Sequence, residues 1–323
     1  MRSRMGCIAA VVGALLAPLP AWAQVALPFE GPIRIICPFP AGGSSDAMAR
    51  LIADKMQATF GRSVIVENKT GAGGRIGAEY MKTVPADGSQ IILATVSIMV
   101  LNPVQEKVGY DPIKDFVAIA RAGDFQLPLA TGPMTGAKDL AALIAWLKAN
   151  PDKANYGVPA AGSLPHLYGI QLSKVSNVPM VMAPFRGGAP IAVAVIGGQI
   201  AVGIAATADF AEQHRAGTLR IVALSGTQRM PTLPDVPTFA ELGLKGFEEN
   251  GWNGFFAPAG TSAAVVAAYN KAINDALKSS DVASKLENLG YLIRLSTPEE
   301  LGRQVVDERE KWRPLMVEAG VVK

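Results

Sequence analysis

A strand, a glycine turn and a helix start follow one another directly near the beginning of this 323-residue chain. The apolar run 33–37 predicts a buried strand, and apolar residues at helical spacing begin near Ser44. Between them, Gly42 and Gly43 let the backbone turn sharply and approach a ligand closely. Such a junction aims several unpaired backbone N–H groups at one point. The segment 38–46 therefore predicts an anion-binding site that is built from backbone and needs no catalytic group.

The first 23 residues have the pattern of a secretory signal peptide. Arg2 and Arg4 precede an apolar stretch over 6–17, and Ala21 and Ala23 form a small-residue cleavage site. The stretch is too short to span a bilayer comfortably. The pattern predicts export and cleavage after Ala23, which lowers the formal charge from +3 to +1 because two arginines are removed.

The composition argues against several kinds of site. Cys37 is the only cysteine after residue 23, so no internal disulfide is expected. With only His166 and His214 beside that thiol, a His/Cys metal centre is not expected either. A charge near zero argues against binding to nucleic acid, which needs clustered Lys and Arg. No cofactor is expected.

Strand and helix signals alternate along the whole chain. This alternation predicts an α/β protein with mostly parallel sheets flanked by helices. The pattern restarts after Gly123, which suggests two α/β lobes that face one cleft. The expected strands are 33–37, 64–66, 91–95, 117–119, 125–130, 155–158, 179–182, 201–205, 219–224 and 252–257, and the expected helices are 44–59, 75–82, 137–148, 166–175, 190–196, 262–277 and 298–319.

Glycine loops follow strands in both predicted lobes, where open α/β sheets bind ligands. The loop 71–77, GAGGRIG, has the beginning of a dinucleotide motif, but the third glycine of that motif would fall at Ile76. We therefore interpret the loop as part of a cleft wall or a hinge.

Eight segments in order resemble the periplasmic solute-binding proteins of the tripartite tricarboxylate transporters, also called the Bordetella uptake gene (Bug) family. They read IICPFPAGGSSDAMARLIADKM, VIVENKTGAGGRIG, PADGSQIILATVS, YDPIKDF, YGVPAAGSLPHL, FRGGAP, LPDVPTFAELG and WNGFFAPAGT. The resemblance implies a two-lobed Venus-flytrap fold in the periplasm. It implies a discontinuous domain 1, residues 24–124 and 251–323, and a domain 2 over 125–250. It also implies a small organic carboxylate ligand and an inner-membrane permease that meets the protein transiently. A monomer is the default expectation.

The resemblance assigns ligand-binding residues to both domains. Those of domain 1 are Phe39, Ala41, Gly42, Gly43, Ser44, Ser45, Asp46, Thr95 and Ser97. Those of domain 2 are Gly162, Ser163, Arg186, Gly187 and Gly188. In this assignment Asp46 orients a water molecule or caps the helix, and the domain 2 residues hold the far end of the ligand.

One departure from the family pattern concerns the segment 197–205, where common acidic positions are Ala201 and Ala205. We expect a less polar wall there, which suits a ligand with a hydrophobic or aromatic body.

Two other functions stay open at this point. The first is a sensor or scavenger that binds ligand without a permease of its own. The second is an exported serine hydrolase that uses Ser163 and His166, which is disfavoured because no acid is evident to orient the imidazole and the G-x-S-x-G pattern is absent.

Overall fold

The computed structural model describes residues 27–105, 108–318 and 321–322, so the expected signal peptide lies outside the described residues. The strands are β1 (Ile33–Cys37), β2 (Val64–Asn68), β3 (Gln90–Thr95), β4 (Phe116–Phe125), β5 (Pro128–Thr131), β6 (Asn155–Val158), β7 (Val181–Pro184), β8 (Val202–Ile204), β9 (Arg220–Leu224), β10 (Gly251–Pro258) and β11 (Tyr291–Ile293). The α-helices are α1 (Ser44–Phe60), α2 (Arg75–Met81), α3 (Asn102–Gln105), α4 (Leu140–Ala149), α5 (Leu164–Ser176), α6 (Gly188–Ile196), α7 (Ala211–Arg215), α8 (Ala263–Lys278), α9 (Ser280–Asn288) and α10 (Pro298–Glu318). None of these helices is both long enough and apolar enough to cross a membrane.

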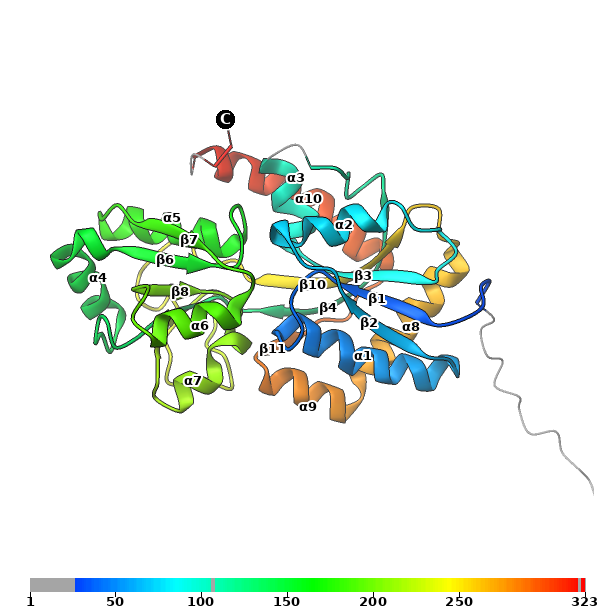
Figure 1. Ribbon diagram of the computed structural model, residues 1–323, viewed down its shortest axis with the longest axis horizontal. Coiled ribbons are helices and arrows are strands. Elements are labelled where there is room, and N and C mark those ends of the chain that lie inside the picture. The colour runs from blue at the N-terminus through cyan, green and yellow to red at the C-terminus, as the bar shows by residue number, and fades with distance from the viewer. Residues whose placement is uncertain (1–26, 106–107, 319–320, 323) are drawn as a thin grey trace, which may run out of the picture.

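The elements form two lobes, each a sheet flanked by helices, and this α/β two-lobed architecture is the predicted one (Figure 1). The first lobe holds a six-stranded sheet in the order β11-β4-β10-β3-β1-β2, and the second a five-stranded sheet in the order β7-β6-β8-β5-β9. The expectation of mostly parallel sheets is wrong, because both sheets are mixed. In the first lobe, β10 returns from far along the chain and pairs antiparallel with both β3 and β4. In the second, β5 pairs antiparallel with β8 and β9.

The chain passes between the sheets at two places that lie against each other. One is the short link from β4 to β5, and the other is the segment that leads from β9 to β10. The side chain of Gln126 donates a hydrogen bond to the carbonyl of Ser225 at 2.6 Å, and the Leu127 N–H donates to the Ser225 hydroxyl at 2.8 Å. These bonds tie the two crossings together at the junction of the lobes. The finer domain boundaries, 24–124 with 251–323 and 125–250, stay a prediction.

The first strand and helix form where the sequence predicts them. In α1, Met48, Ile52 and Met56 recur every four residues and are fully buried, so one face of the helix packs on the sheet. The helix ends at Gly61, whose φ of +61° is the left-handed conformation that glycine adopts most readily.

Several elements differ from the prediction. Helix α5 begins at Leu164, two residues early, because proline is tolerated in the first turn, where Pro165 lies. Strand β4 runs on to Phe125, far beyond its predicted end. A π-helical turn over Ser97–Leu101, together with α9 and β11, was not expected.

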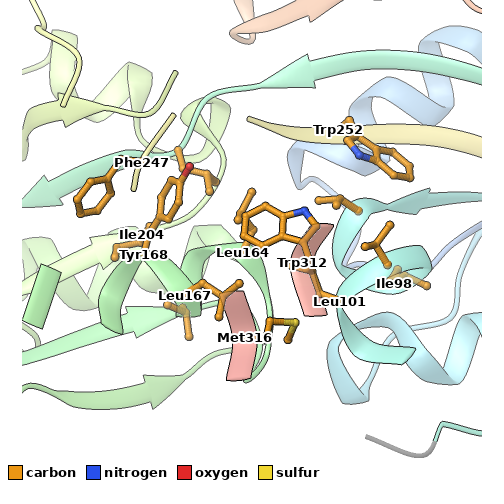
Figure 2. Close-up of a cluster of buried hydrophobic side chains, with 14 of the residues drawn as sticks. Ile98, Leu101, Leu164, Leu167, Tyr168, Ile204, Phe247, Trp252, Trp312 and Met316 are labelled. Atoms are coloured by element: carbon orange, nitrogen blue, oxygen red, sulfur yellow. The ribbon is translucent and has the colours of Figure 1, made fainter. Parts of the chain in front are cut away.

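A buried apolar cluster joins the two lobes on the side of α10. Figure 2 shows Trp312 and Met316 of α10 near Leu164 and Leu167 of α5, with Ile98 of the first lobe in the same cluster. The carboxyl-terminal helix therefore packs against both lobes.

Candidate functional site

The amino end of α1 follows the tight turn that the sequence predicts. Gly42 has a φ of +80°, and Gly43 is the N-cap residue, with no side-chain bond to the helix. Asp46 accepts hydrogen bonds from the Gly42 N–H at 2.9 Å, from Arg50 at 2.9 Å and from Asn68 at 2.8 Å. Burial opposes ionisation of Asp46, but these hydrogen bonds outweigh it and hold its pKa below the usual value. Asp46 therefore stabilises the turn that precedes α1.

A cavity of about 110 Å³ lies between the lobes, and residues from both form its walls. Most of the sequence-predicted site residues line it, namely Phe39, Ala41, Gly43, Ser44, Ser45, Thr95, Ser97, Ser163, Arg186, Gly187 and Gly188. Gly42, Asp46 and Gly162 are not among its lining residues. Gly42 and Asp46 shape the turn, and the Gly162 N–H donates to His166 Nδ1 at 3.0 Å. Gly73 of the glycine loop also lines the cavity, in agreement with its interpretation as a cleft wall.

Three helix amino ends meet at this cavity. The N-cap residues are Gly43 for α1, Ser163 for α5 and Gly187 for α6, and all three line the cavity. Two of these N-cap residues are glycines, and the Ser163 hydroxyl donates to the carbonyl of Ala160 at 2.7 Å rather than capping its helix. Other side chains bond the first residue of two of the helices, because Ser97 accepts from the Leu164 N–H of α5 and the Asp209 carboxyl bonds the Ser44 backbone of α1. The remaining N–H groups of each amino end, and its partial positive charge, are directed at the cavity.

The polar side chains that line the cavity differ in whether they already have hydrogen-bond partners. The Ser97 hydroxyl accepts a hydrogen bond from the Leu164 N–H at 3.4 Å, and Ser45 Oγ accepts one from Asn253 at 3.4 Å. Thr95 is only 7% exposed, and its hydroxyl has no hydrogen-bond partner among the described residues. Arg186 is exposed and forms no ion pair within the described part of the chain. Thr95 and Arg186 are therefore the side chains most available to a ligand.

An acidic residue that sequence reasoning missed lies in the same wall. Asp209 ends a short turn after β8 and lines the cavity. Burial raises its pKa to about 7, although backbone hydrogen bonds with Ala206 and Ser44 act in the opposite direction. The rule that ligands lie beyond the carboxyl ends of strands could have found it.

The expectation that Ala201 and Ala205 form a cavity wall is wrong. Both are buried in the apolar core beside β8, at 0% and 1% exposure, and neither lines the cavity. The second-lobe wall is formed there by Ala206 and Asp209, so it carries an acid after all.

The arrangement of Ser163 and His166 does not suit a hydrolase. The serine hydroxyl points to a backbone carbonyl, and His166 Nδ1 is occupied by a backbone N–H. The imidazole also stacks on Tyr156 at 6.3 Å between ring centroids, and burial lowers its pKa. No hydrogen bond joins the two side chains in the described structure, and so nothing activates the serine as a nucleophile.

Comparison with known proteins gives the family. Residues 48–321 match the model of the tripartite tricarboxylate transporter family receptor. The solved periplasmic binding protein BugD is 32% identical, with a TM-score of 0.86 over 91% of this chain and 99% of BugD. Rpa4515 of R. palustris, solved with adipate, is 30% identical, with a TM-score of 0.85 over 89% of this chain and 97% of its own. MatC of Rhodopseudomonas palustris, solved with malate, is 30% identical, with a TM-score of 0.83 over 88% and 99%. The resemblance and the two-lobed fold are confirmed, and the chain belongs to the tripartite tricarboxylate transporter receptors, a family of periplasmic solute-binding proteins.

Proposed function

We propose that this chain is a periplasmic receptor that captures a small organic carboxylate in the cavity between its lobes. The observation that carries the proposal is the convergence of the amino ends of α1, α5 and α6 on one cavity, with no cap from the side chains of their own N-cap residues. A carboxylate satisfies several such N–H groups at once and also meets the positive ends of the helix dipoles. A neutral ligand of the same shape gains much less.

The placement of these helices favours a ligand with polar groups at both ends. Helix α1 belongs to the first lobe, whereas α5 and α6 belong to the second. Charge-assisted hydrogen bonds contribute about 1.5–3 kcal/mol each. Four of them, less the cost of ordering the ligand and closing the lobes, reach the roughly 8 kcal/mol of micromolar binding. A ligand that spans the cavity thus holds the lobes together.

The cavity also has an apolar surface that suits an apolar ligand body. Its walls include Phe39, Val96, Phe125, Leu164 and Pro190. An aliphatic dicarboxylate matches this pattern of polar ends and apolar walls. Adipate and malate, the ligands of the two related R. palustris structures, are molecules of this kind.

The receptor acts as a monomer and delivers its ligand to a tripartite tricarboxylate permease in the inner membrane. The family description supports such a partner. Delivery is tested by uptake of labelled ligand into cells. Loss of either this protein or the permease abolishes uptake, and normal uptake without the permease refutes delivery.

Binding is tested by thermal unfolding with malate, adipate, citrate, aspartate and benzoate, each compared with its neutral amide. A ligand that binds only the folded protein raises the melting temperature by mass action. We expect a carboxylate to raise it and the matched amide to leave it unchanged. Equal shifts with acid and amide would refute recognition of the carboxylate by the helix amino ends.

A further inference from the structure

Asp209 brings a carboxyl group of the second lobe to the amino end of a first-lobe helix. It follows β8 in the second lobe, and its carboxyl takes part in a backbone hydrogen bond with Ser44, the first residue of α1. It also lies against the amino end of α6, because a Cβ added to Gly188 would approach Asp209 Oδ2 to 2.0 Å. One protein carboxyl group thus lies among the N–H groups that suit a ligand carboxylate.

Among the residues that the structure describes, no cation forms an ion pair with Asp209. Its pKa is raised by burial and lowered only by backbone hydrogen bonds, with no contribution from a charged neighbour. Arg186, on the loop before α6, lines the same cavity, but it forms no ion pair with Asp209 in the described structure. On α1, Asp46 is bound to Arg50. Tyr291 of β11 is the other ionisable group nearby, and burial together with the charge on Asp209 raises its pKa above the ordinary range. The amino ends of α1 and α6 favour the carboxylate form of Asp209, but burial opposes it more strongly, so the net effect raises its pKa.

An anionic ligand in the cavity disfavours the carboxylate form of Asp209 further. Two carboxylates that share a site cannot both stay ionised at little cost, and one of them takes up a proton. Because Ser44 and Asp209 belong to different lobes, opening the cavity breaks their contact and returns the carboxyl to water.

We propose that closure of the lobes around an anionic ligand favours the neutral form of Asp209, so that capture of the ligand takes up a proton. Neutral Asp209 can then donate its O–H to the ligand carboxylate or another acceptor in the cavity. This inference rests on the proposed function, and it makes binding stronger in acidic than in alkaline surroundings.

The linkage fixes the size and sign of the effect. In this structure burial raises the pKa of the Asp209 carboxyl to about 7, and exposure to water in an open form would return that pKa to its ordinary value. Between these two values the closed form is protonated and the open form is not, so affinity falls as the pH rises. Between pH 6 and pH 8.5 the loss is about tenfold, and it levels off once both forms are ionised.

The experiment is calorimetric titration with malate, adipate, citrate and benzoate at pH 6 and pH 8.5, in buffers of different ionisation enthalpy. The variants are Asp209→Asn, which keeps the shape without the charge, and Asp209→Ala, in case the first does not fold. Glu212→Gln is the matched control, since it removes an exposed carboxylate three residues further along. The proton uptake of the variant is subtracted from that of the wild type. The difference excludes protons that the ligand or the histidines exchange.

We expect the wild type and Glu212→Gln to take up about one proton per ligand at pH 6 and almost none at pH 8.5. Both Asp209 variants should take up none and should bind with nearly the same affinity at the two pH values. If ligand binds but proton uptake is the same in the wild type and the Asp209 variants, the inference is overturned and the proposed function stands. If none of the four ligands binds any variant, the proposed function itself fails.

Discussion

The Thr95 hydroxyl offers a substitution whose effects on stability and on binding should separate. Thr95 ends β3, lines the cavity and has a buried hydroxyl with no partner among the described residues. Replacing it with valine keeps the shape and removes only that polar atom. An unpaired buried hydroxyl costs about 1–3 kcal/mol, so Thr95→Val should leave the ligand-free protein as stable as the wild type or more stable.

Binding should respond in the opposite direction. If the hydroxyl donates to a ligand carboxylate, its loss removes about 1.5–3 kcal/mol of binding free energy, which raises the dissociation constant roughly 10- to 150-fold. The matched control is Thr131→Val, because the Thr131 hydroxyl is fully buried and donates to the Ala201 carbonyl at 2.8 Å. The control should lose about 1–3 kcal/mol of stability and keep its affinity.

The assay combines urea unfolding without ligand and calorimetric titration with adipate. Wild-type affinity in Thr95→Val would remove that hydroxyl from the site. A loss of stability equal to that of Thr131→Val would show that the hydroxyl is already satisfied, and the reasoning would be refuted.

Four further substitutions test the turn and the rim of the cavity. Arg186→Gln should weaken dicarboxylate binding up to about fivefold at low ionic strength and less at high salt, because the guanidinium is exposed, and titration at two salt concentrations checks this. Asp46→Asn should cost about 1–3 kcal/mol of stability at pH 7 through the loss of its bonds to Arg50 and the Gly42 N–H. The folded-state pKa of Asp46 is lowered, so its contribution to stability is present above pH 4 and disappears as the pH falls through that lowered pKa. Urea unfolding at pH 7, 5 and 3 should therefore show the difference in stability between wild type and Asp46→Asn shrink. A constant difference would contradict this reasoning. Gly42→Val should destabilise the protein by about 1–2 kcal/mol because its φ is +80°, whereas Gly43→Ala, at a φ of −77°, should fold normally; equal stability of the two variants would contradict the strained turn.

Local signals in the sequence predict the part of the site that a continuous segment builds. The strand, turn and helix around Gly42 need only neighbouring residues, and they form as expected. The same holds for the glycine turn before α6, where Gly187 has a φ of +105°. These loops meet at the cavity because both follow the carboxyl ends of strands.

Sheet order, strand β11 and the place of Asp209 depend on distant parts of the chain and were not predicted. Sheet order depends on β10, which inserts antiparallel between β3 and β4 after more than a hundred intervening residues. Strand β11 has three residues and is held by its pairing with β4, so it has little signal of its own. Asp209 was missed for a similar reason. Its importance comes from Ser44 and Gly188, which are remote in sequence and lie beside Asp209 only in the folded protein.

The most direct test of the account is a crystal structure of the protein with adipate. It should show one carboxylate within hydrogen-bond distance of the backbone N–H groups at the start of α1, near Ser44 and Ser45. The other carboxylate should meet the amino ends of α5 and α6, near Ser163 and Gly188. Adipate outside the cavity, or held by one lobe alone, would contradict the claim that converging helix ends recognise the ligand.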